Sequence, residues 1–250
     1  MTALARIRRR LASEAGFTLV EMLTAMVIGT VVVFAAFTFM ERSFTASTDV
    51  ADRVDAAQRG RVAMDAITRQ LRSQVCVAAK LPLQAATATS ATFTTDLTDG
   101  TPPKPTDSPP RYGPEWRTLT FAPAAGGYTV TEQDYAMTAG PPLATTVTWA
   151  STPKRTTTLL TGAAQSGATP FLQYFGFDNS KTPPQFKEFT SPLSAADLSN
   201  VTQIRVTFVV RPAHTQSNAN RGATLTDQIT LPQADPNQTD PNKATVSPTC

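Results

Sequence analysis

An apolar run of 24 residues, Phe17–Met40, limits how this chain can fold more than any other feature, because its single charge is Glu21. A helix of that length, rising about 1.5 Å per residue, would be roughly 36 Å long, enough to cross a hydrocarbon core of about 30 Å. Four basic residues precede the run: Arg6, Arg8, Arg9 and Arg10. Basic residues next to a membrane-spanning helix favour the cytoplasmic side, so these arginines predict a cytoplasmic N-terminus and an exported C-terminal part.

The length of this apolar run and the presence of Glu21 within it distinguish between the possible kinds of N-terminal segment. A secretory signal peptide has an apolar region of about 7–15 residues followed by a small-residue cleavage site, and neither feature fits here. A plain signal anchor explains the length of the run. It does not explain Glu21, because a carboxylate within a membrane helix costs on the order of a few kcal/mol.

The stretch GFTLVE, Gly16 to Glu21, resembles the processing motif of type IV pilins and pseudopilins. The likeness comprises a short basic leader, Gly16, Phe17, a spacer, Glu21 and an apolar helix. It implies that prepilin peptidase removes residues 1–16 by cutting after Gly16 and methylates the new N-terminal residue, Phe17. The expected location is the cytoplasmic (inner) membrane, followed by a filament at the cell surface or in the periplasm.

The resemblance also implies a role for Glu21 in subunit docking. The new amine of Phe17 and the Glu21 carboxylate are both costly in an apolar environment unless they are paired. In the family, the glutamate of one subunit pairs with the amine of a neighbour, and such a pair can define the register between helices. The alternative is that Glu21 extends to the lipid headgroups. The implied partners are prepilin peptidase, other pilins and a membrane assembly platform.

Beyond residues 17–40, the segment 41–80 is predicted to continue as an amphipathic helix that packs on a head domain. One helix from Phe17 to about Val77 would span roughly 90 Å, and Gly60 is expected to bend or loosen it. The apolar positions recur mostly at spacings of three or four residues: Phe44, Val50, Val54, Ala57, Met64, Ile67, Leu71 and Val75.

After Pro82 the pattern changes to short strands, so residues 81–232 are predicted to form a β-rich globular head. The fold class is therefore α+β. Residues 101–110 form a proline-rich loop, residues 233–250 an irregular tail, and Ser194–Asn200 a short helix with Ser194 as its N-cap. The predicted strands are Ala91–Leu97, Trp116–Phe121, Gly127–Glu132, Thr145–Trp149, Thr156–Thr161, Phe171–Phe177, Val201–Arg211 and Thr224–Leu231.

Several short stretches of the head are similar to the J-type minor pseudopilins and related large minor pilins. They are LRSQVC (Leu71–Cys76), TFTTDL (Thr92–Leu97), FLQYFGFD (Phe171–Asp178) and LSNVTQIRVTFVV (Leu198–Val210). This likeness implies a large minor subunit near the tip of a filament or in the initiation of assembly. The motif is common to pilus, secretion and DNA-uptake systems.

Two other residue sets raise hypotheses about the head and its tail. An exported domain would permit a disulfide between Cys76 and Cys250, with two free thiols as the alternative. The tail carries two D-P-N units whose oxygen atoms suit calcium: Asp235, Asn237, Asp240 and Asn242. That segment lacks the glycine and final glutamate of an EF-hand, so a solvated, turn-rich tail is the preferred interpretation.

The sequence offers no catalytic constellation. The only histidine, His214, has no plausible paired base, and nucleophile-elbow, P-loop and zinc-protease motifs are absent. The formal charge of +3 resides in the leader, so no basic stripe indicates nucleic-acid binding. We therefore expect a structural subunit with no cofactor and no enzymatic activity. The alternatives are a membrane-anchored binding domain that does not polymerise, and an exported enzyme.

Overall fold

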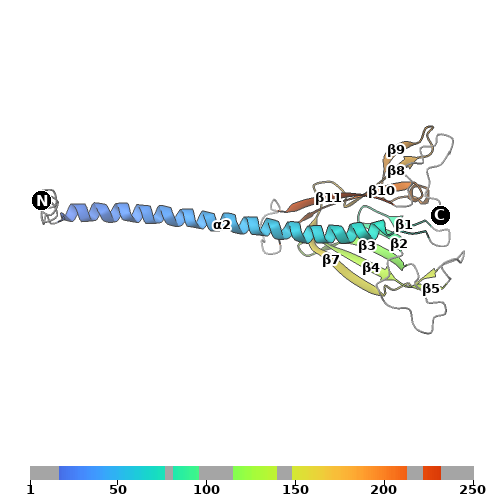
Figure 1. The fold of residues 1–250 in the computed structure, drawn as a ribbon, viewed down its shortest axis with the longest axis horizontal. Helices are drawn as coiled ribbons and strands as arrows, with labels where there is room; N and C mark the ends of the chain where they lie inside the picture. Colours follow the sequence, from blue (N-terminus) through green and yellow to red (C-terminus); the bar gives the residue numbers. More distant parts are fainter. Residues whose placement is uncertain (1–16, 77–80, 96–114, 140–147, 213–221, 232–250) are drawn as a thin grey trace, which may run out of the picture. The chain divides into compact units, whose positions relative to one another are not determined.

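The computed structural model describes residues 17–76, 81–95, 115–139, 148–212 and 222–231. The chain forms two compact units, Met1–Ala51 and Asp52–Cys250; the second is called the head below. Helix α2 (Leu19–Arg72) contributes residues to both units. The predicted α+β class is confirmed, because a long N-terminal helix is followed by a large antiparallel sheet (Figure 1).

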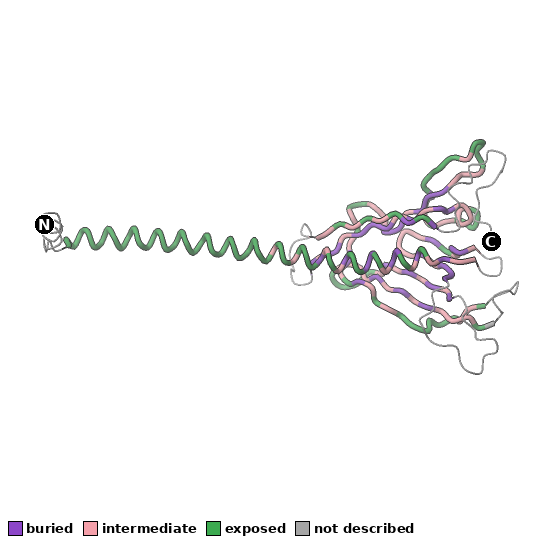
Figure 2. The backbone as a smooth tube through the Cα atoms, in the orientation of Figure 1, coloured by how far each residue is buried: buried purple, intermediate pink, exposed green. Residues whose placement is uncertain are grey.

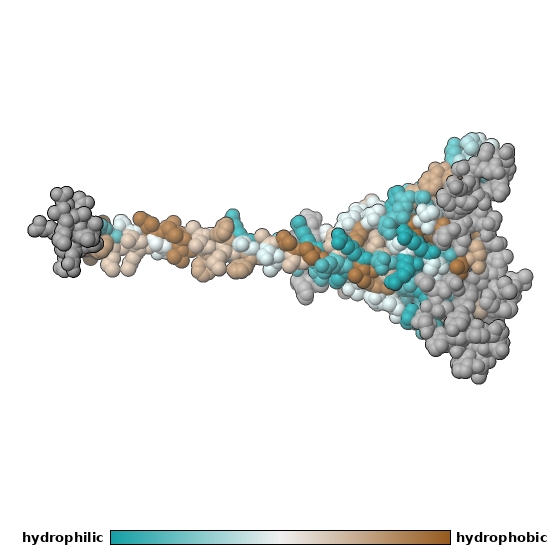
Figure 3. Space-filling view, viewed as in Figure 1, coloured by the Kyte–Doolittle hydropathy of each residue, from teal (hydrophilic) through white to brown (hydrophobic). Residues whose placement is uncertain are grey.

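The first unit exposes nearly all of its described side chains, as the green tube of α2 shows in Figure 2. Most of these side chains are apolar, and they appear brown or tan in Figure 3. Helix α2 is long and apolar enough to cross a membrane. Apolar surface on this scale is stable only against lipid or other apolar helices, which agrees with the expected membrane span.

The head is built on one antiparallel sheet, in which nine of the described strands take part. Its order is β1-β2-β3-β4-β7-β10-β8-β9, with β11 also paired to β10, while β5 and β6 form a separate pair. The strands are β1 (Leu83–Ala86), β2 (Ser90–Thr95), β3 (Glu115–Ala124), β4 (Gly127–Tyr135), β5 (Met137–Ala139), β6 (Thr148–Trp149), β7 (Arg155–Ala164), β8 (Leu172–Asp178), β9 (Gln185–Phe189), β10 (Val201–Val210) and β11 (Ala223–Thr230).

Strand β10 is the centre of the sheet. It pairs with β11 from Gln203 to Val210, with β8 over its first half, and with β7 at its last two residues. Its predicted alternation is confirmed, since Ile204, Val206, Phe208 and Val210 are fully buried. The period of two places these side chains on one face, where they form part of the core under α2.

One face of α2 packs on this core within the head, but it is not quite the predicted face. The buried residues are Ala56, Gly60, Ala63, Met64, Ile67, Thr68 and Leu71. Phe44, Val50 and Val54 are exposed, so the prediction was wrong for these side chains. The face in contact has alanine and glycine at its N-terminal end because small residues let the helix backbone approach the sheet closely.

Gly60 marks that close approach rather than a break in the helix. A Cβ atom at this position would lie 2.5 Å from Leu225 Cδ1 and 2.9 Å from Val210 Cγ2. Nearby, the Arg59 guanidinium donates to the Arg211 carbonyl oxygen at 2.8 Å, and the Thr68 hydroxyl donates to Asp227 Oδ2 at 2.8 Å. These contacts join the helix to β11 and to the end of β10.

The other predictions for the head are mostly confirmed. All eight predicted strands overlap observed ones, and Ser194 caps the short helix α3 (Ala195–Leu198). Helix α2 ends at Arg72 rather than near Val77, because Gln74 already pairs with Thr95. Strands β1, β5 and β9 were missed. Strands β1 and β5 are very short, and four of the five residues of β9 are exposed, so none of the three has a run of alternating apolar and polar residues.

Replacing Gly60 by valine should destabilise the head by about 1–3 kcal/mol, because the added side chain overlaps Leu225 and Val210. Denaturant unfolding of the purified protein, followed by tryptophan fluorescence, measures the change. Gly29→Val is the matched control, since a Cβ atom at Gly29 meets nothing within 4 Å. Equal stability of the two variants would contradict the close packing at Gly60.

Candidate processing and assembly site

The first turn of α2 positions Glu21, one of the residues predicted to act in docking, through contacts with Thr18. The Glu21 amide donates to Thr18 Oγ1 at 3.2 Å, and the Thr18 hydroxyl lies 3.5 Å from Glu21 Oε2. Threonine as N-cap with glutamate three residues later is the spacing of a capping box. Thr18 therefore satisfies one of the free N–H groups of the helix end and holds the carboxylate over the first turn.

Phe17 precedes the helix and is 86% exposed. Glu21 is exposed as well, and among the described residues it forms no ion pair with a basic side chain. Gly16, on the other side of the predicted cleavage bond, lies outside the described residues. The structure thus presents Phe17 and Glu21 at an open helix end, available to an enzyme or a neighbouring chain.

The electrostatics of a helix N-terminus indicate what Glu21 can do there. A cut before Phe17 would place a cationic amine next to the positive end of the helix dipole, which is unfavourable. A carboxylate in the first turn is favourable at the same position, and it can offset the charge of an amine. One glutamate can therefore stabilise its own helix and also offer a negative charge to a partner.

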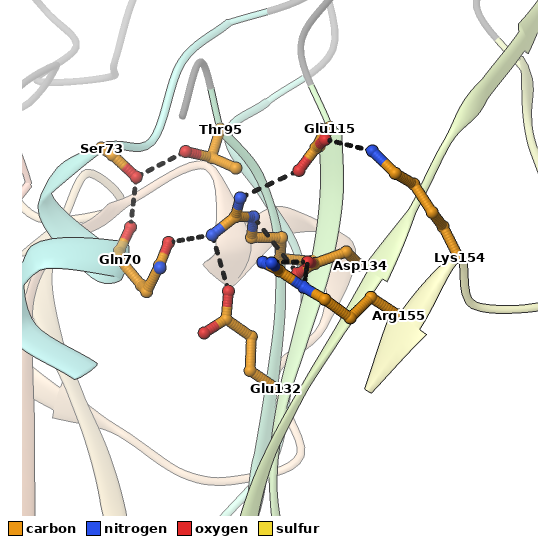
Figure 4. Close-up of polar contacts among 9 residues, drawn as sticks. Gln70, Ser73, Thr95, Glu115, Glu132, Asp134, Lys154 and Arg155 are labelled. Atoms are coloured by element: carbon orange, nitrogen blue, oxygen red, sulfur yellow. Dashed lines mark hydrogen bonds and ion pairs between the residues drawn. The ribbon is translucent and has the colours of Figure 1, made fainter. Parts of the chain in front are cut away.

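A second polar site, which was not predicted from the sequence, lies inside the head around Arg117; Figure 4 labels the residues that surround this arginine, among them Gln70, Glu115, Glu132 and Asp134. The Arg117 side chain is only 2% exposed and contacts three carboxylates from two adjacent strands. Its Nη2 lies 2.9 Å from Glu115 Oε2, its Nη1 2.6 Å from Glu132 Oε1, and its Nε 3.4 Å from Asp134 Oδ1.

Two further basic residues balance the three carboxylates, and a hydrogen bond connects the cluster to α2. Lys154 Nζ lies 3.2 Å from Glu115 Oε1, and Arg155 Nη2 lies 2.8 Å from Asp134 Oδ2, so three cations meet three anions. Arg117 Nη1 also donates to Gln70 Oε1 of α2 at 2.5 Å. The cluster therefore connects the last turns of α2 to β3 and β4. Burial raises the pKa of the Glu132 carboxyl, although the adjacent Arg117 acts in the opposite direction.

A signal for this cluster was present in the strand register. Arg117 precedes the buried Leu119 by two residues, and Glu132 follows the buried Val130 by two residues. A period of two therefore places both charges on the buried face of their strands. Charged residues on a buried face must be paired, so an internal ion cluster could have been inferred.

The remaining predicted site residues are placed only in part. Cys76 is disulfide-bonded, while Cys250 lies outside the described residues, so the predicted pair stays a prediction. His214 and the calcium candidates Asp235, Asn237, Asp240 and Asn242 also lie outside them. Within the described ranges, no group of three or more His, Cys, Asp or Glu side chains could hold a metal ion.

Replacing Arg117 by methionine should cost about 3–5 kcal/mol of stability, because three buried carboxylates would lose their central cation. Denaturant titration of the purified protein measures the loss. Arg205→Met is the control, since the Arg205 side chain packs over the Phe175 ring without any ion pair in the described part of the chain. Losses of similar size would show that the buried cluster contributes no special stability.

The Glu132→Gln variant should reveal the raised pKa of Glu132. Because the folded-state pKa lies above 4.5, the stabilisation from Glu132 is greatest below that pH and is lost as pH rises through the folded-state value. Glutamine does not ionise, so the stability of the variant relative to the wild type should rise as the pH increases from 4.5 towards neutrality. Denaturant unfolding across this range, with Glu188→Gln at an exposed position as control, tests it. A constant difference would refute the assignment.

Comparison with known proteins identifies the N-terminal site. Residues 11–37 match a family model described as the prokaryotic N-terminal methylation motif. The matched segment contains Gly16, Phe17 and Glu21 and ends within the apolar part of α2. No curated protein and no solved structure matches the chain. The motif indicates a substrate of prepilin peptidase and supports a type IV pilin-like protein.

Proposed function

We propose that this chain is a minor pilin or pseudopilin, a structural subunit without enzymatic activity. Prepilin peptidase cleaves it after Gly16 and methylates Phe17, and the mature subunit then leaves the inner membrane to join a type IV pilus or a type II secretion pseudopilus. The observation that carries the proposal is the methylation motif at the start of an exposed helix that is apolar enough to cross a membrane.

The size of the head supports a minor position near the filament tip, with a role in starting assembly. Nine of the described strands form its main sheet, and β5 and β6 form an additional two-stranded sheet. A head this large is easier to accommodate at a tip or at sparse positions than in every subunit along a filament. The partners on this proposal are other pilins, through the apolar half of α2, and a membrane assembly platform.

The first test is the N-terminal sequence of the protein isolated from membranes with and without active prepilin peptidase. We expect methylated Phe17 as the first residue when the peptidase is active and the leader to remain when it is absent. A protein that keeps its leader despite active peptidase would instead be a membrane-anchored binding domain that does not polymerise.

Replacing Glu21 by alanine should reduce incorporation into filaments at least about tenfold, because an amine left without its partner in an apolar interface costs several kcal/mol. Cleavage after Gly16 should continue, so mature protein should accumulate in the membrane. The control is Glu41→Ala, an exposed carboxylate beyond the apolar run of the same helix. Sheared filament fractions and membrane fractions are compared by immunoblot. Normal incorporation of the Glu21 variant would refute its role in docking.

A further inference from the structure

On strands β2, β3, β4 and β7, the side of the sheet that faces away from α2 carries two rows of residues without a charged side chain. Burial alternates along β3 and β4, and the buried members of this pattern include Arg117 and Glu132. Arg117 contacts Gln70 of α2, so the buried members point toward the helix. The partly exposed residues between them therefore form the opposite side, called the outer face below.

Two rows of hydroxyl and amide side chains cross four neighbouring strands on the outer face. Directly paired residues of an antiparallel sheet point to the same side, with strands about 4.8 Å apart. The first row is Ser90, Thr120, Thr131 and Thr158. The second row is Thr92, Thr118, Gln133 and Thr156. The result is a regular grid of groups that can both donate and accept hydrogen bonds.

An aromatic cluster adjoins this grid. Trp116 and Tyr135 are paired one step further along β3 and β4, and their ring centroids lie 6.0 Å apart. The Trp149 ring lies 6.0 Å from that of Trp116, so both tryptophans of the chain meet here. The Tyr135 hydroxyl donates to Gln133 Oε1 at 3.1 Å, which joins the rings to the polar rows.

This combination indicates the chemistry of a ligand. A neutral polysaccharide offers hydroxyl groups that donate and accept hydrogen bonds, and its sugar rings have apolar C–H faces that pack on aromatic rings. A nucleic acid or another polyanion would find no counter-charge in these rows. The centre of a protein interface is typically apolar, whereas the two rows contain no aliphatic side chain.

We propose that the outer face binds a neutral polysaccharide laid across β2, β3, β4 and β7, with sugar rings against the cluster of Trp116, Tyr135 and Trp149. The hydroxyl and amide rows hold the chain through hydrogen bonds, and the rings contribute apolar contact. This binding does not depend on filament assembly, because every residue involved belongs to one head.

The test uses the purified full-length protein in micelles of a detergent without a sugar headgroup. The protein is mixed with insoluble cellulose, with chitin and with a polyanionic pectate gel, and its depletion from solution is measured. We expect retention by at least one neutral polysaccharide and none by the polyanion. Absence of retention by both cellulose and chitin overturns the proposal, even if the same protein assembles normally into filaments.

Paired variants locate the binding surface. Thr156→Lys with Thr158→Lys adds two charges to exposed positions of the outer face and should weaken retention at least about tenfold, because the ligand offers no partner for them. Thr224→Lys with Thr226→Lys makes the same change at exposed positions of β11 and should leave retention unchanged. Unchanged thermal melting shows that both fold. Equal effects of the two pairs, or no effect of the first, overturn the location.

Discussion

The burial of one face of α2 against the sheet is the interaction on which the head depends. A single helix segment, with its small and apolar side chains between Ala56 and Leu71, covers the inner side of a sheet whose centre is β10. Removing this apolar surface from water is the main favourable term in folding. Gly60 permits the close approach of the helix to the sheet. The hydrogen bonds from Arg59 to the Arg211 carbonyl oxygen and from Thr68 to the Asp227 carboxylate determine the position of the helix along the sheet.

The same helix makes the buried ion cluster possible. Arg117 and its three carboxylates are largely withdrawn from water under the last turns of α2, and Gln70 contributes a further hydrogen bond. A buried pair contributes little net stability when formed, but it is costly to break. The cluster is therefore better understood as a constraint on register: the helix and the strands β3 and β4 fit together in one arrangement, in which every charge finds its partner.

Strands β3 and β4 show an inversion of the usual distribution of charge between the two faces of a sheet. On β3 and β4 the charged residues point inward, where they pair, while the outer face offers hydroxyls, an amide and aromatic rings. Two adjacent rows of uncharged, partly exposed side chains are suited to a neutral, hydroxylated ligand. The first unit has a different surface. Its helix exposes apolar side chains and begins with a capped first turn, and such a surface is suited to contact with lipid or with the helices of other subunits.

Several features could be predicted from the amino-acid sequence alone: an apolar run long enough to span a membrane, a methylation motif that contains Phe17 and Glu21, the α+β class and most strands. These features depend on local periodicity and on short motifs. The short or exposed strands β1, β5 and β9 were not predicted, because they lack an alternating pattern. The buried face of α2 was also not predicted correctly, because Ala56 and Gly60 lie on it for their small size, which lets the helix approach the sheet, and not for their hydrophobicity. The charges that meet at Arg117 and the side chains that share the outer face became apparent only from the folded structure, because both depend on the register between strands and on the packing of α2 against them.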